Sequence, residues 1–151
     1  MFFWSIKKNG TQESQALGRS KGGFTTKVHG VCDALGNPLH FILSPGQASD
    51  SKYAIPLIHH LRYKALLADK GYDADSIISH ILSNGARAII PSKKNRLVKR
   101  NLDAELYKER HKIECLFGFL KHYRRLFSRF EKYASRFMAF LHFVSTLQWL
   151  K

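Results

Sequence analysis

The sequence predicts an α/β fold in which helices flank a mixed β-sheet. The strongest indication is the order of local patterns, which runs strand, strand, helix, strand, helix, strand, helix and helix. The length of 151 residues suffices for one domain with a substantial buried core. Hydrophobic residues make up 44% of the chain and charged residues 24%, a composition that is typical of globular proteins and argues against a disordered chain.

The N-terminal third predicts a β-hairpin that follows a polar, glycine-containing loop at 7–23. Segment 24–32 is rich in β-branched residues and predicts a strand, and segment 39–43 predicts its partner. The intervening sequence DALGNP, at 33–38, combines Asp, Gly, Asn and Pro, which all favour a turn. We expect residues 1–14 to form a poorly ordered N-terminal segment.

The middle of the chain alternates helical and extended patterns. Ser49 or Asp50 can cap the first helix with a side-chain oxygen, and Asn84 and Gly85 suit the end of the second. Pro91 ends the last extended run. The expected elements are a helix from Ser49 or Asp50 to about Arg62, a strand at 63–68, a turn at 69–73, a helix at 74–83 and a strand at 87–90.

Two long helices are expected to complete the fold by packing on the sheet. The first runs from Asp103 to about Phe127 and the second from Glu131 to Leu150, after a basic loop at 92–100. Aromatic residues recur near helical spacing in this part of the chain, and we expect them to be core residues rather than platforms for stacked bases. They are Phe127, Phe130, Tyr133, Phe137, Phe140 and Phe143.

The charge of the chain is strongly positive and unevenly distributed. Lysine and arginine number 25 against 11 aspartate and glutamate residues, which gives a formal net charge of +14 at pH 7. A field of this sign and size attracts polyanions, among which DNA and RNA are the commonest. Residues 93–151 hold 15 of the cations against 5 acidic residues, so the field belongs mostly to the C-terminal part.

The basic loop at 92–100 is the first candidate for contact with phosphate. Lys93, Lys94 and Arg96 lie close together in it, and each phosphate that they neutralise would release counterions. A flexible, solvated run of charge is the alternative interpretation. The same surface could extend over four further arginines, Arg124, Arg125, Arg129 and Arg136.

Cysteine positions and apolar segments argue against several other classes of protein. Cys32 and Cys115 lie far apart and form no CxxC pair, which argues against a disulfide scaffold or a structural zinc site and fits a reducing cytoplasm. The most apolar stretch, from Phe137 to Leu150, is too short and too polar to cross a bilayer, so we expect no membrane partner.

One edge of the helix predicted from Asp103 gathers residue types that suit phosphate chemistry. Four residues spaced by three, four and seven positions fall, at about 100° per residue, within a sector of about 60°. They are Tyr107, Arg110, Glu114 and Lys121. Interpreted structurally, they form the salt-bridged, solvated flank of an amphipathic helix. Interpreted functionally, Glu114 is a metal-ligating carboxylate whose cationic neighbours hold phosphate.

Asp69 is the second candidate carboxylate. It follows the strand predicted at 63–68, and α/β sheets carry their sites at the carboxyl ends of strands. Gly71 permits a tight backbone beside it, although an ordinary turn aspartate has the same sequence context. Asp73 and Asp75 precede the next helix, and we assign them to its capping and its dipole.

Two carboxylates at the ends of separate elements in a basic protein indicate phosphoryl transfer assisted by a divalent metal. Mg²⁺ prefers carboxylate oxygens, and a pair of metal ions clamps the attacking and leaving oxygens of an in-line displacement. Such a site normally needs a third acidic residue.

Two blocks of the sequence resemble the second and third catalytic blocks of bacterial insertion-sequence DDE transposases, and the closest group is the insertion-sequence-five family. They are the DKGYD sequence at 69–73 and the spaced set Tyr107, Arg110, Glu114 and Lys121. The resemblance runs from about residue 11 to the C-terminus. It implies a ribonuclease-H-like fold, with 15–151 as the C-terminal part of a DDE transposase catalytic domain.

The resemblance also implies roles for individual residues. Asp69 and Glu114 would be the second and third catalytic, metal-binding carboxylates, with Mg²⁺ or Mn²⁺ as the cofactor. Tyr107, Arg110 and Lys121 would contact the DNA of the transposon ends. The partners would be terminal inverted repeats and target DNA, together with a second copy of the chain or an upstream half of the transposase, in the bacterial cytoplasm at the nucleoid.

The first aspartate of the family pattern has no counterpart in this chain. The family places it on the first strand of the sheet, whereas no acidic residue precedes Glu13 here, and the largely apolar segment 1–6 offers no carboxylate. We therefore expect an N-terminally truncated sheet that lacks its first strand, in a frameshift half or a decayed fragment that does not transpose DNA alone. The alternatives to an enzyme are a non-catalytic DNA-binding module and an inhibitor of transposition.

Overall fold

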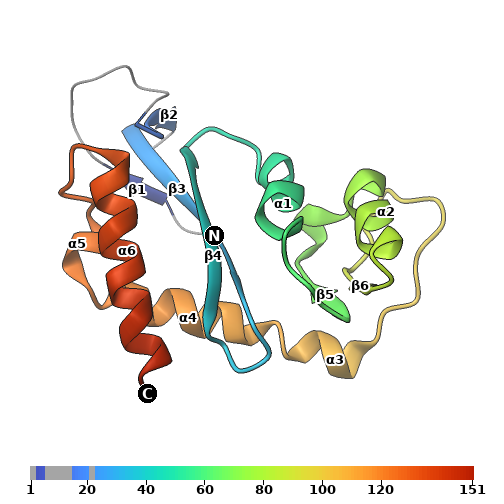
Figure 1. Ribbon diagram of the computed structural model, residues 1–151. Coiled ribbons are helices and arrows are strands. Elements are labelled where there is room, and N and C mark those ends of the chain that lie inside the picture. Colours follow the sequence, from blue (N-terminus) through green and yellow to red (C-terminus); the bar gives the residue numbers. More distant parts are fainter. Residues whose placement is uncertain (1–2, 6–14, 21–22) are drawn as a thin grey trace. The chain divides into compact units, whose positions relative to one another are not determined.

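The computed structural model describes residues 3–5, 15–20 and 23–151. The chain divides into two compact units. The first, here called the sheet unit, comprises Met1–Ala48 and Lys112–Lys151, and the second, the central unit, comprises Ser49–His111. Both combine strands with helices, so the α/β class predicted from the sequence is confirmed (Figure 1). Within the described residues, no helix has both the length and the apolar character needed to cross a membrane.

The sheet unit is built on an antiparallel sheet centred on β3 (Gly23–Cys32). β4 (Pro38–Pro45) pairs with β3 along most of its length and so forms the hairpin predicted from the sequence. Two short strands pair with the first half of β3, namely β1 (Phe3–Ser5) and β2 (Gly18–Ser20). The sheet therefore has four antiparallel strands, and β3 is the strand with which all the others pair.

The strand β1 differs from one expectation. The first strand of the sheet was expected to be absent, whereas Phe3–Ser5 lie antiparallel to residues 25–27 of β3. None of the three residues of β1 carries a carboxylate, so this strand offers no candidate for a first catalytic aspartate. The remaining residues of segment 1–14, which were expected to be poorly ordered, lie outside the described residues.

The conformation of the turn between β3 and β4 depends on its aspartate and glycine residues. The carboxylate of Asp33 accepts the backbone N–H groups of Leu35 and Asn37 at 2.8 and 2.9 Å. Gly36 adopts a φ of +91°, a left-handed conformation that glycine tolerates far better than other residues. Asp33 therefore builds the turn, as the sequence DALGNP predicted.

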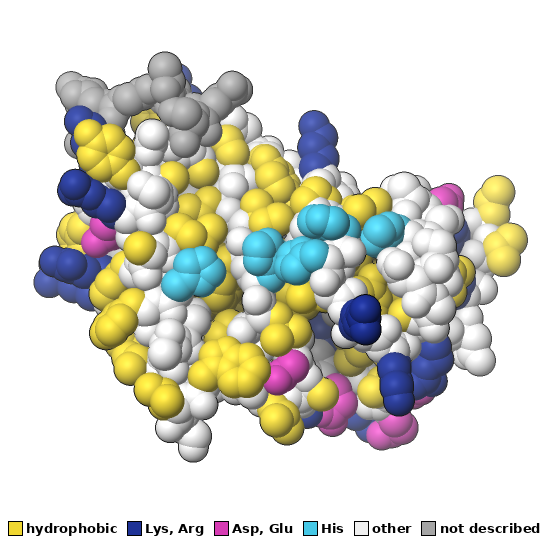
Figure 2. Space-filling view, in the orientation of Figure 1, with side chains coloured by type: hydrophobic (Ala, Val, Ile, Leu, Met, Phe, Trp, Pro, Cys, Tyr) yellow, Lys and Arg dark blue, Asp and Glu magenta, His cyan; other side chains and the backbone are white. Residues whose placement is uncertain are grey.

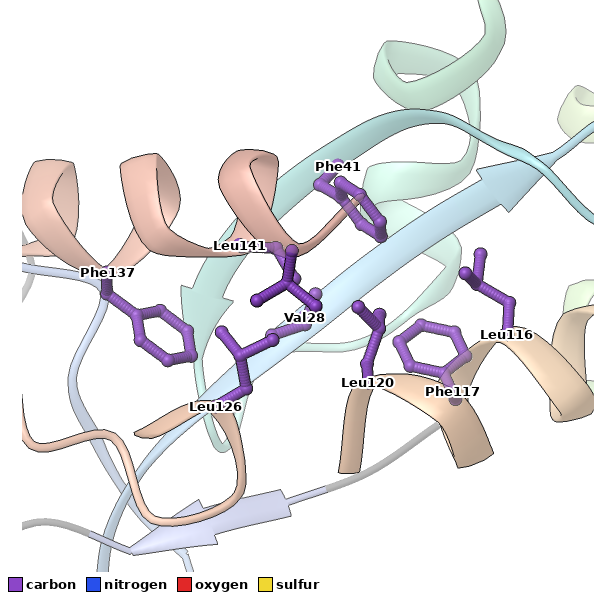
Figure 3. Packing of buried hydrophobic residues seen from close by; sticks show 9 residues of the cluster. Val28, Phe41, Leu116, Phe117, Leu120, Leu126, Phe137 and Leu141 are labelled. Carbon is purple, nitrogen blue, oxygen red and sulfur yellow. The ribbon is translucent and has the colours of Figure 1, made fainter. Parts of the chain in front are cut away.

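The core of the sheet unit is formed by the sheet and three helices, α4 (His111–Lys121), α5 (Arg124–Phe127) and α6 (Ala134–Trp149). Figure 3 shows side chains from β3, β4 and all three helices converging on one cluster. Removing such apolar surface from water stabilises the unit by roughly 25 cal/mol per Å². The cluster comprises Val28, Phe41, Leu116, Phe117, Leu120, Leu126, Phe137, Leu141 and Val144.

The single helix predicted from Asp103 to Phe127 is broken into three in the structure. α3 (Ala104–Lys108) is separated from α4 by residues 109–110, and α4 is separated from α5 by residues 122–123. The prediction of one continuous helix is therefore wrong. The expectation that all of its residues share one set of helix faces is wrong for the same reason.

Histidine side chains lie at both breaks. The Nδ1 atom of His111 lies 2.9 Å from the carbonyl oxygen of Lys108, and that of His122 lies 2.9 Å from the carbonyl oxygen of Gly118. These rings satisfy carbonyl groups at which the helical backbone bonding stops. The backbone N–H of His122 turns instead to the carbonyl of Phe119, three residues back, which tightens the end of α4.

The central unit contains two short parallel strands, β5 (Ala65–Leu67) and β6 (Arg87–Ile89). The connection between them holds a 3₁₀ turn, η1 (Lys70–Tyr72), and a helix, α2 (Asp75–Ser83). A helical crossover of this kind is what a parallel pair requires. Gly85 follows α2 with a φ of +70°, which confirms the predicted helix end.

The first helix of the central unit, α1 (Ser51–Ile58), is shorter than predicted. The helix was expected to reach about Arg62, but it ends at Ile58. Pro56 lies inside it and supplies no backbone N–H, which weakens its last turn. The Nδ1 atom of His59 then lies 2.9 Å from the carbonyl oxygen of Pro56, so a histidine ring ends this helix as well.

Candidate functional site

Asp69 lies just beyond the carboxyl end of β5. Its Oδ1 accepts the backbone N–H of Gly71 at 2.6 Å and so begins the 3₁₀ turn η1. A Cβ atom at position 71 would lie 2.7 Å from that oxygen, so any residue larger than glycine would displace the carboxylate. Asp69 is exposed, and its Oδ2 has no hydrogen-bond partner among the described residues. The sequence DKG thus fixes Oδ1 of Asp69 in a hydrogen bond and leaves Oδ2 available to a ligand.

Tyr72 lies in the same turn as the fixed carboxylate. Burial raises the pKa of its phenol well above the usual range, and the carboxylates of Asp50 and Asp69 raise this pKa further. The phenol therefore keeps its proton at neutral pH. Tyr72 adds no negative charge to the surroundings of Asp69.

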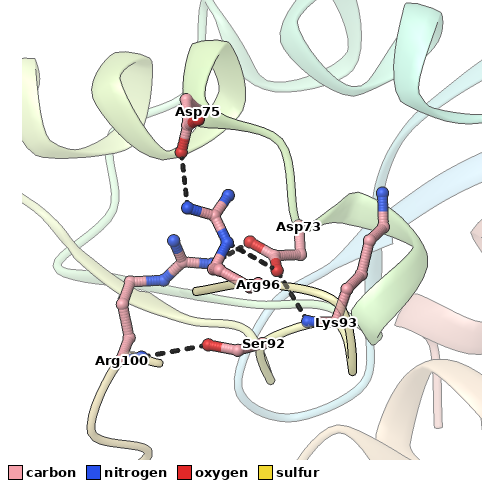
Figure 4. Close-up of polar contacts among 6 residues, drawn as sticks. All are labelled: Asp73, Asp75, Ser92, Lys93, Arg96 and Arg100. Atoms are coloured by element: carbon pink, nitrogen blue, oxygen red, sulfur yellow. Dashed lines mark hydrogen bonds and ion pairs between the residues drawn. The ribbon is translucent and has the colours of Figure 1, made fainter. Parts of the chain in front are cut away.

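Asp73 is a buried carboxylate that anchors the basic loop (Figure 4). Its side chain has no exposed surface and accepts hydrogen bonds from the backbone N–H of Lys93 at 2.7 Å, from Nε of Arg96 at 3.0 Å and from the guanidinium of Arg100. Burial alone would raise the pKa of the carboxyl, but these donors lower the pKa of Asp73 to about 2. The backbone N–H of Arg100 also donates to Oγ of Ser92 at 3.0 Å, so the loop is held near both of its ends.

This role of Asp73 corrects the assignment made from the sequence. Asp73 was assigned to capping of the following helix, but the N-cap residue of α2 is Ala74, whose side chain makes no capping hydrogen bond. Asp75 lies in the first turn of α2, as expected, and its Oδ1 lies 2.7 Å from Nη1 of Arg96. The partners of Asp73 lie 20 to 27 residues further along the chain, so no local pattern could reveal them.

The basic loop presents its lysines and keeps its arginines engaged. Both guanidinium groups, those of Arg96 and Arg100, face carboxylates. Lys93, Lys94 and Lys99 are exposed and form no ion pair among the described residues. The residues predicted to contact phosphate therefore differ in their surroundings, because Arg96 orders the loop while the lysines stand at its surface.

Tyr107 and Arg110 belong to the central unit. Tyr107 lies in α3, and Arg110 lies at the break that follows this helix. The guanidinium carbon of Arg110 is 5.6 Å from the centroid of the Tyr107 ring, a cation–π contact. Both residues are half-buried, and the contact with the Tyr107 ring holds the guanidinium of Arg110 beside it.

Glu114 and Lys121 belong to the sheet unit and lie in the first and last turns of α4. Glu114 is exposed, and its negative charge is favourable near the positive end of the helix dipole. Leu116, Phe117 and Leu120 anchor α4 in the core. Because α3 and α4 are separate helices, the structure does not form the stripe of four residues predicted along one helix edge.

The two candidate carboxylates come from different units, Asp69 from the central unit and Glu114 from the sheet unit. Carboxylate oxygens are the hard donors that Mg²⁺ and Mn²⁺ prefer, so each residue fits the role of a metal ligand. In the part of the chain that the structure describes, no group of three histidine, cysteine, aspartate or glutamate side chains is placed to hold a metal ion.

The C-terminal aromatic residues differ from the prediction that they are core residues. The prediction is confirmed for Phe137, which is fully buried. It is wrong for four exposed residues, Phe127, Phe130, Tyr133 and Phe143. Arg129, which was expected to extend the basic surface, is buried instead, and its guanidinium donates to Oγ1 of Thr26.

Comparison with known proteins gives the class of this protein. The chain matches the transposase DDE domain family over residues 2–147, and it belongs to that family. It is 42% identical to a Brucella ovis protein assigned as a transposase for insertion sequence element IS6501, over 129 residues that cover 84% of this chain and 99% of the relative. A Burkholderia cepacia protein assigned as a transposase for insertion sequence element IS402 is 30% identical over 150 residues, which cover 91% of this chain and 66% of the relative. No solved structure matches the chain. The resemblance to bacterial insertion-sequence DDE transposases is confirmed.

Proposed function

We propose that this chain acts in DNA transposition by binding DNA and supporting metal-dependent cleavage and transfer of DNA strands. The proposal rests on the position and hydrogen bonding of Asp69, in a chain that belongs to the transposase DDE domain family. Its carboxylate is exposed, lies at the end of a parallel strand and is oriented by the N–H of Gly71. This arrangement suits a ligand of a divalent cation.

Asp69 and Glu114 are the proposed metal ligands, and Mg²⁺ or Mn²⁺ is the proposed metal. Bound there, the metal would activate water for attack on a phosphodiester and stabilise the charge that develops on the phosphate. The chain contributes by holding the two carboxylates in place. The N–H of Gly71 fixes Asp69, and the buried residues of α4 fix the helix that carries Glu114.

DNA is the proposed partner, both as terminal inverted repeats and as target. The net charge of +14 favours a polyanion, and the exposed lysines Lys93 and Lys94 lie on a loop that Asp73 holds in place. By resemblance, Tyr107, Arg110 and Lys121 contact the transposon ends as well. Because phosphate contacts release counterions, the affinity for DNA is expected to fall steeply with salt. Two ends have to be brought together, so we also propose that a second copy of the chain takes part.

A non-catalytic DNA-binding module is the second candidate function. Such a module would inhibit a complete transposase by occupying its DNA ends or by joining its oligomer. One observation favours it, because β1 carries no acidic residue. A DDE site normally needs a third carboxylate, which would have to come from elsewhere.

Strand cleavage distinguishes the two functions. The substrate is a labelled duplex that carries the end of the insertion element, and Mn²⁺ is present. The chain is assayed alone and together with an upstream transposase half, which supplies a β-strand that bears an aspartate. We expect cleavage only in the combined sample, and we expect Asp69→Asn to lower it at least 100-fold while DNA binding stays unchanged. Glu105→Gln, at an exposed carboxylate of α3, is the control that should change neither property. Cleavage that Asp69→Asn leaves intact would contradict the catalytic proposal.

A further inference from the structure

The C-terminal part of the sheet unit carries an excess of cations without matching acidic residues. From Cys115 to Lys151 the chain has seven lysine and arginine residues and one acidic residue, Glu131. The Glu131 side chain is 13% exposed, and its Oε1 lies 3.9 Å from Nη1 of Arg125. Arg125 therefore has an acidic partner, whereas Arg124, Lys132 and Arg136 are exposed and form no ion pair among the described residues.

Several of these cations lie over exposed aromatic rings. The guanidinium carbon of Arg124 is 5.5 Å from the centroid of the Phe130 ring, and that of Arg136 is 5.3 Å from the centroid of the Tyr133 ring. Phe130 and Tyr133 are 56% and 44% exposed, so both rings remain accessible. Lys132 adds a second cation, 5.8 Å from the Tyr133 ring. We call this set the arginine–aromatic surface: Arg124, Phe130, Lys132, Tyr133 and Arg136.

A buried arginine supports this surface from beneath. Arg129 is 1% exposed, and its guanidinium donates to Oγ1 of Thr26 and to the carbonyl oxygen of Gln15, the latter at 2.9 Å. Its Nε also donates to the carbonyl oxygen of Glu131 at 3.3 Å. The bonds to Thr26 and Gln15 tie the segment between α5 and α6 to β3 and to the residues before β2. Phe130 and Tyr133 therefore project from an anchored backbone, and ordering them on binding costs little entropy.

We propose that the arginine–aromatic surface binds unpaired nucleotides of single-stranded DNA. Bases would stack on Phe130 and Tyr133, while Arg124, Lys132 and Arg136 would neutralise the backbone phosphates. This combination of rings and cations is how proteins hold single strands without reading their sequence. A purely apolar protein partner would not require cations over the rings, and a duplex would present no free base faces. The inference rests on the proposed function in one respect, namely that DNA is the partner.

The test compares two fluorescein-labelled probes with the whole chain, an oligothymidylate of about 20 nucleotides and a duplex of the same length. Binding is followed by fluorescence anisotropy. The double variant Phe130→Leu, Tyr133→Leu should weaken oligothymidylate binding about tenfold or more, since base stacking on one ring contributes on that order. Duplex binding should change less than about twofold in the same variant.

Two further variants separate stacking from charge and from general surface effects. Arg124→Gln combined with Arg136→Gln should weaken binding and make its salt dependence shallower by about 1.4, because each phosphate contact on a single strand contributes about 0.7 to the slope. Phe143→Leu is the matched control, because Phe143 is 61% exposed on α6 outside the arginine–aromatic surface. It should leave both affinities unchanged.

A second readout protects the test against misfolded variants. Circular dichroism should show unchanged helix content, and an oligonucleotide containing bromodeoxyuridine should cross-link to the unaltered chain at Phe130 or Tyr133. Oligothymidylate binding that survives Phe130→Leu, Tyr133→Leu in a folded protein would overturn the inference, as would cross-links confined to other segments. Neither result would touch the proposed function, because duplex binding and the effect of Asp69→Asn on cleavage are measured separately.

Discussion

Two basic regions of the chain use arginine in different ways. In the loop after β6, Arg96 and Arg100 pair with Asp73, a carboxylate with no exposed surface. In the arginine–aromatic surface, Arg124 and Arg136 lie over exposed rings. Both regions contribute to the same net charge of +14, yet the first uses its guanidinium groups to order the backbone and the second leaves them at the surface. The net charge thus indicates a polyanionic partner. The immediate neighbours of each arginine determine whether its guanidinium is available to contact that partner.

The largest effect is expected from breaking the first region at Asp73. Asp73→Asn should lower the free energy of unfolding of the central unit by about 2–3 kcal/mol, because two guanidinium groups lose a buried, charged acceptor. Urea denaturation followed by circular dichroism measures this loss. Asp75→Asn is the control and should cost less than about 1 kcal/mol, because Asp75 is largely exposed. Equal losses in the two variants would show that burial of Asp73 is not what holds the loop.

The pH dependence of the same carboxylate gives the second test. The native contacts hold the pKa of Asp73 at about 2, below the value of about 3.9 expected for an unfolded chain. The contribution of Asp73 to stability is therefore fully present above about pH 5 and is lost as the pH falls toward 2. Urea denaturation between pH 2 and 6 should show the difference between the unaltered chain and Asp73→Asn shrinking as the solution becomes more acidic. A difference that stays constant over this range would contradict the assignment.

A direct comparison of one arginine from each region sharpens the contrast. Arg96→Gln should lower the free energy of unfolding by about 1.5–3 kcal/mol, because it removes charged hydrogen bonds to Asp73 and Asp75. Arg136→Gln should cost less than about 1 kcal/mol, since an exposed cation–π contact contributes no more than that. Urea denaturation of both variants under one set of conditions gives the comparison. Similar losses would remove the distinction between the two regions.

The smallest effect on stability is expected for the lysines of the loop. Lys93→Gln combined with Lys94→Gln should leave the free energy of unfolding within about 0.5 kcal/mol of its original value, because both side chains are exposed. Duplex DNA affinity should nevertheless fall, and its salt dependence should become shallower by about 1.8, which corresponds to two lost phosphate contacts. Anisotropy titrations over a range of salt concentrations measure the slope. An unchanged slope would show that these lysines do not contact phosphate.

The parts of the fold that the sequence predicted depend on chemistry between close neighbours. The hairpin turn is built by Asp33 and Gly36 within a few residues, and the end of α2 is marked by Gly85. The breaks on either side of α4 were missed because neither proline nor glycine marks them. Histidine rings contact the free carbonyl groups there, as His122 does at the end of α4. The helical periodicity of apolar residues does not predict such contacts.

The candidate site shows the same division between local and distant causes. Asp69 could be predicted, because Gly71, which orients it, lies two residues away. The role of Asp73 could not be predicted, because its partners come from a loop beyond α2 and β6. The exposure of Phe130 and Tyr133 likewise depends on the anchoring of the segment before α6 by Arg129. The helical spacing of aromatic residues gives no information about this anchoring.

The most direct test of the proposed site is the binding of Mn²⁺ to the whole chain, followed by paramagnetic broadening of backbone amide signals in NMR spectra. If Asp69 and Glu114 hold one metal ion, signals around both residues should broaden over the same range of Mn²⁺ concentration, and Asp69→Asn should abolish both effects together. Glu105→Gln should leave both effects in place. Broadening around Asp69 without broadening around Glu114, or around neither residue, would contradict a shared metal site.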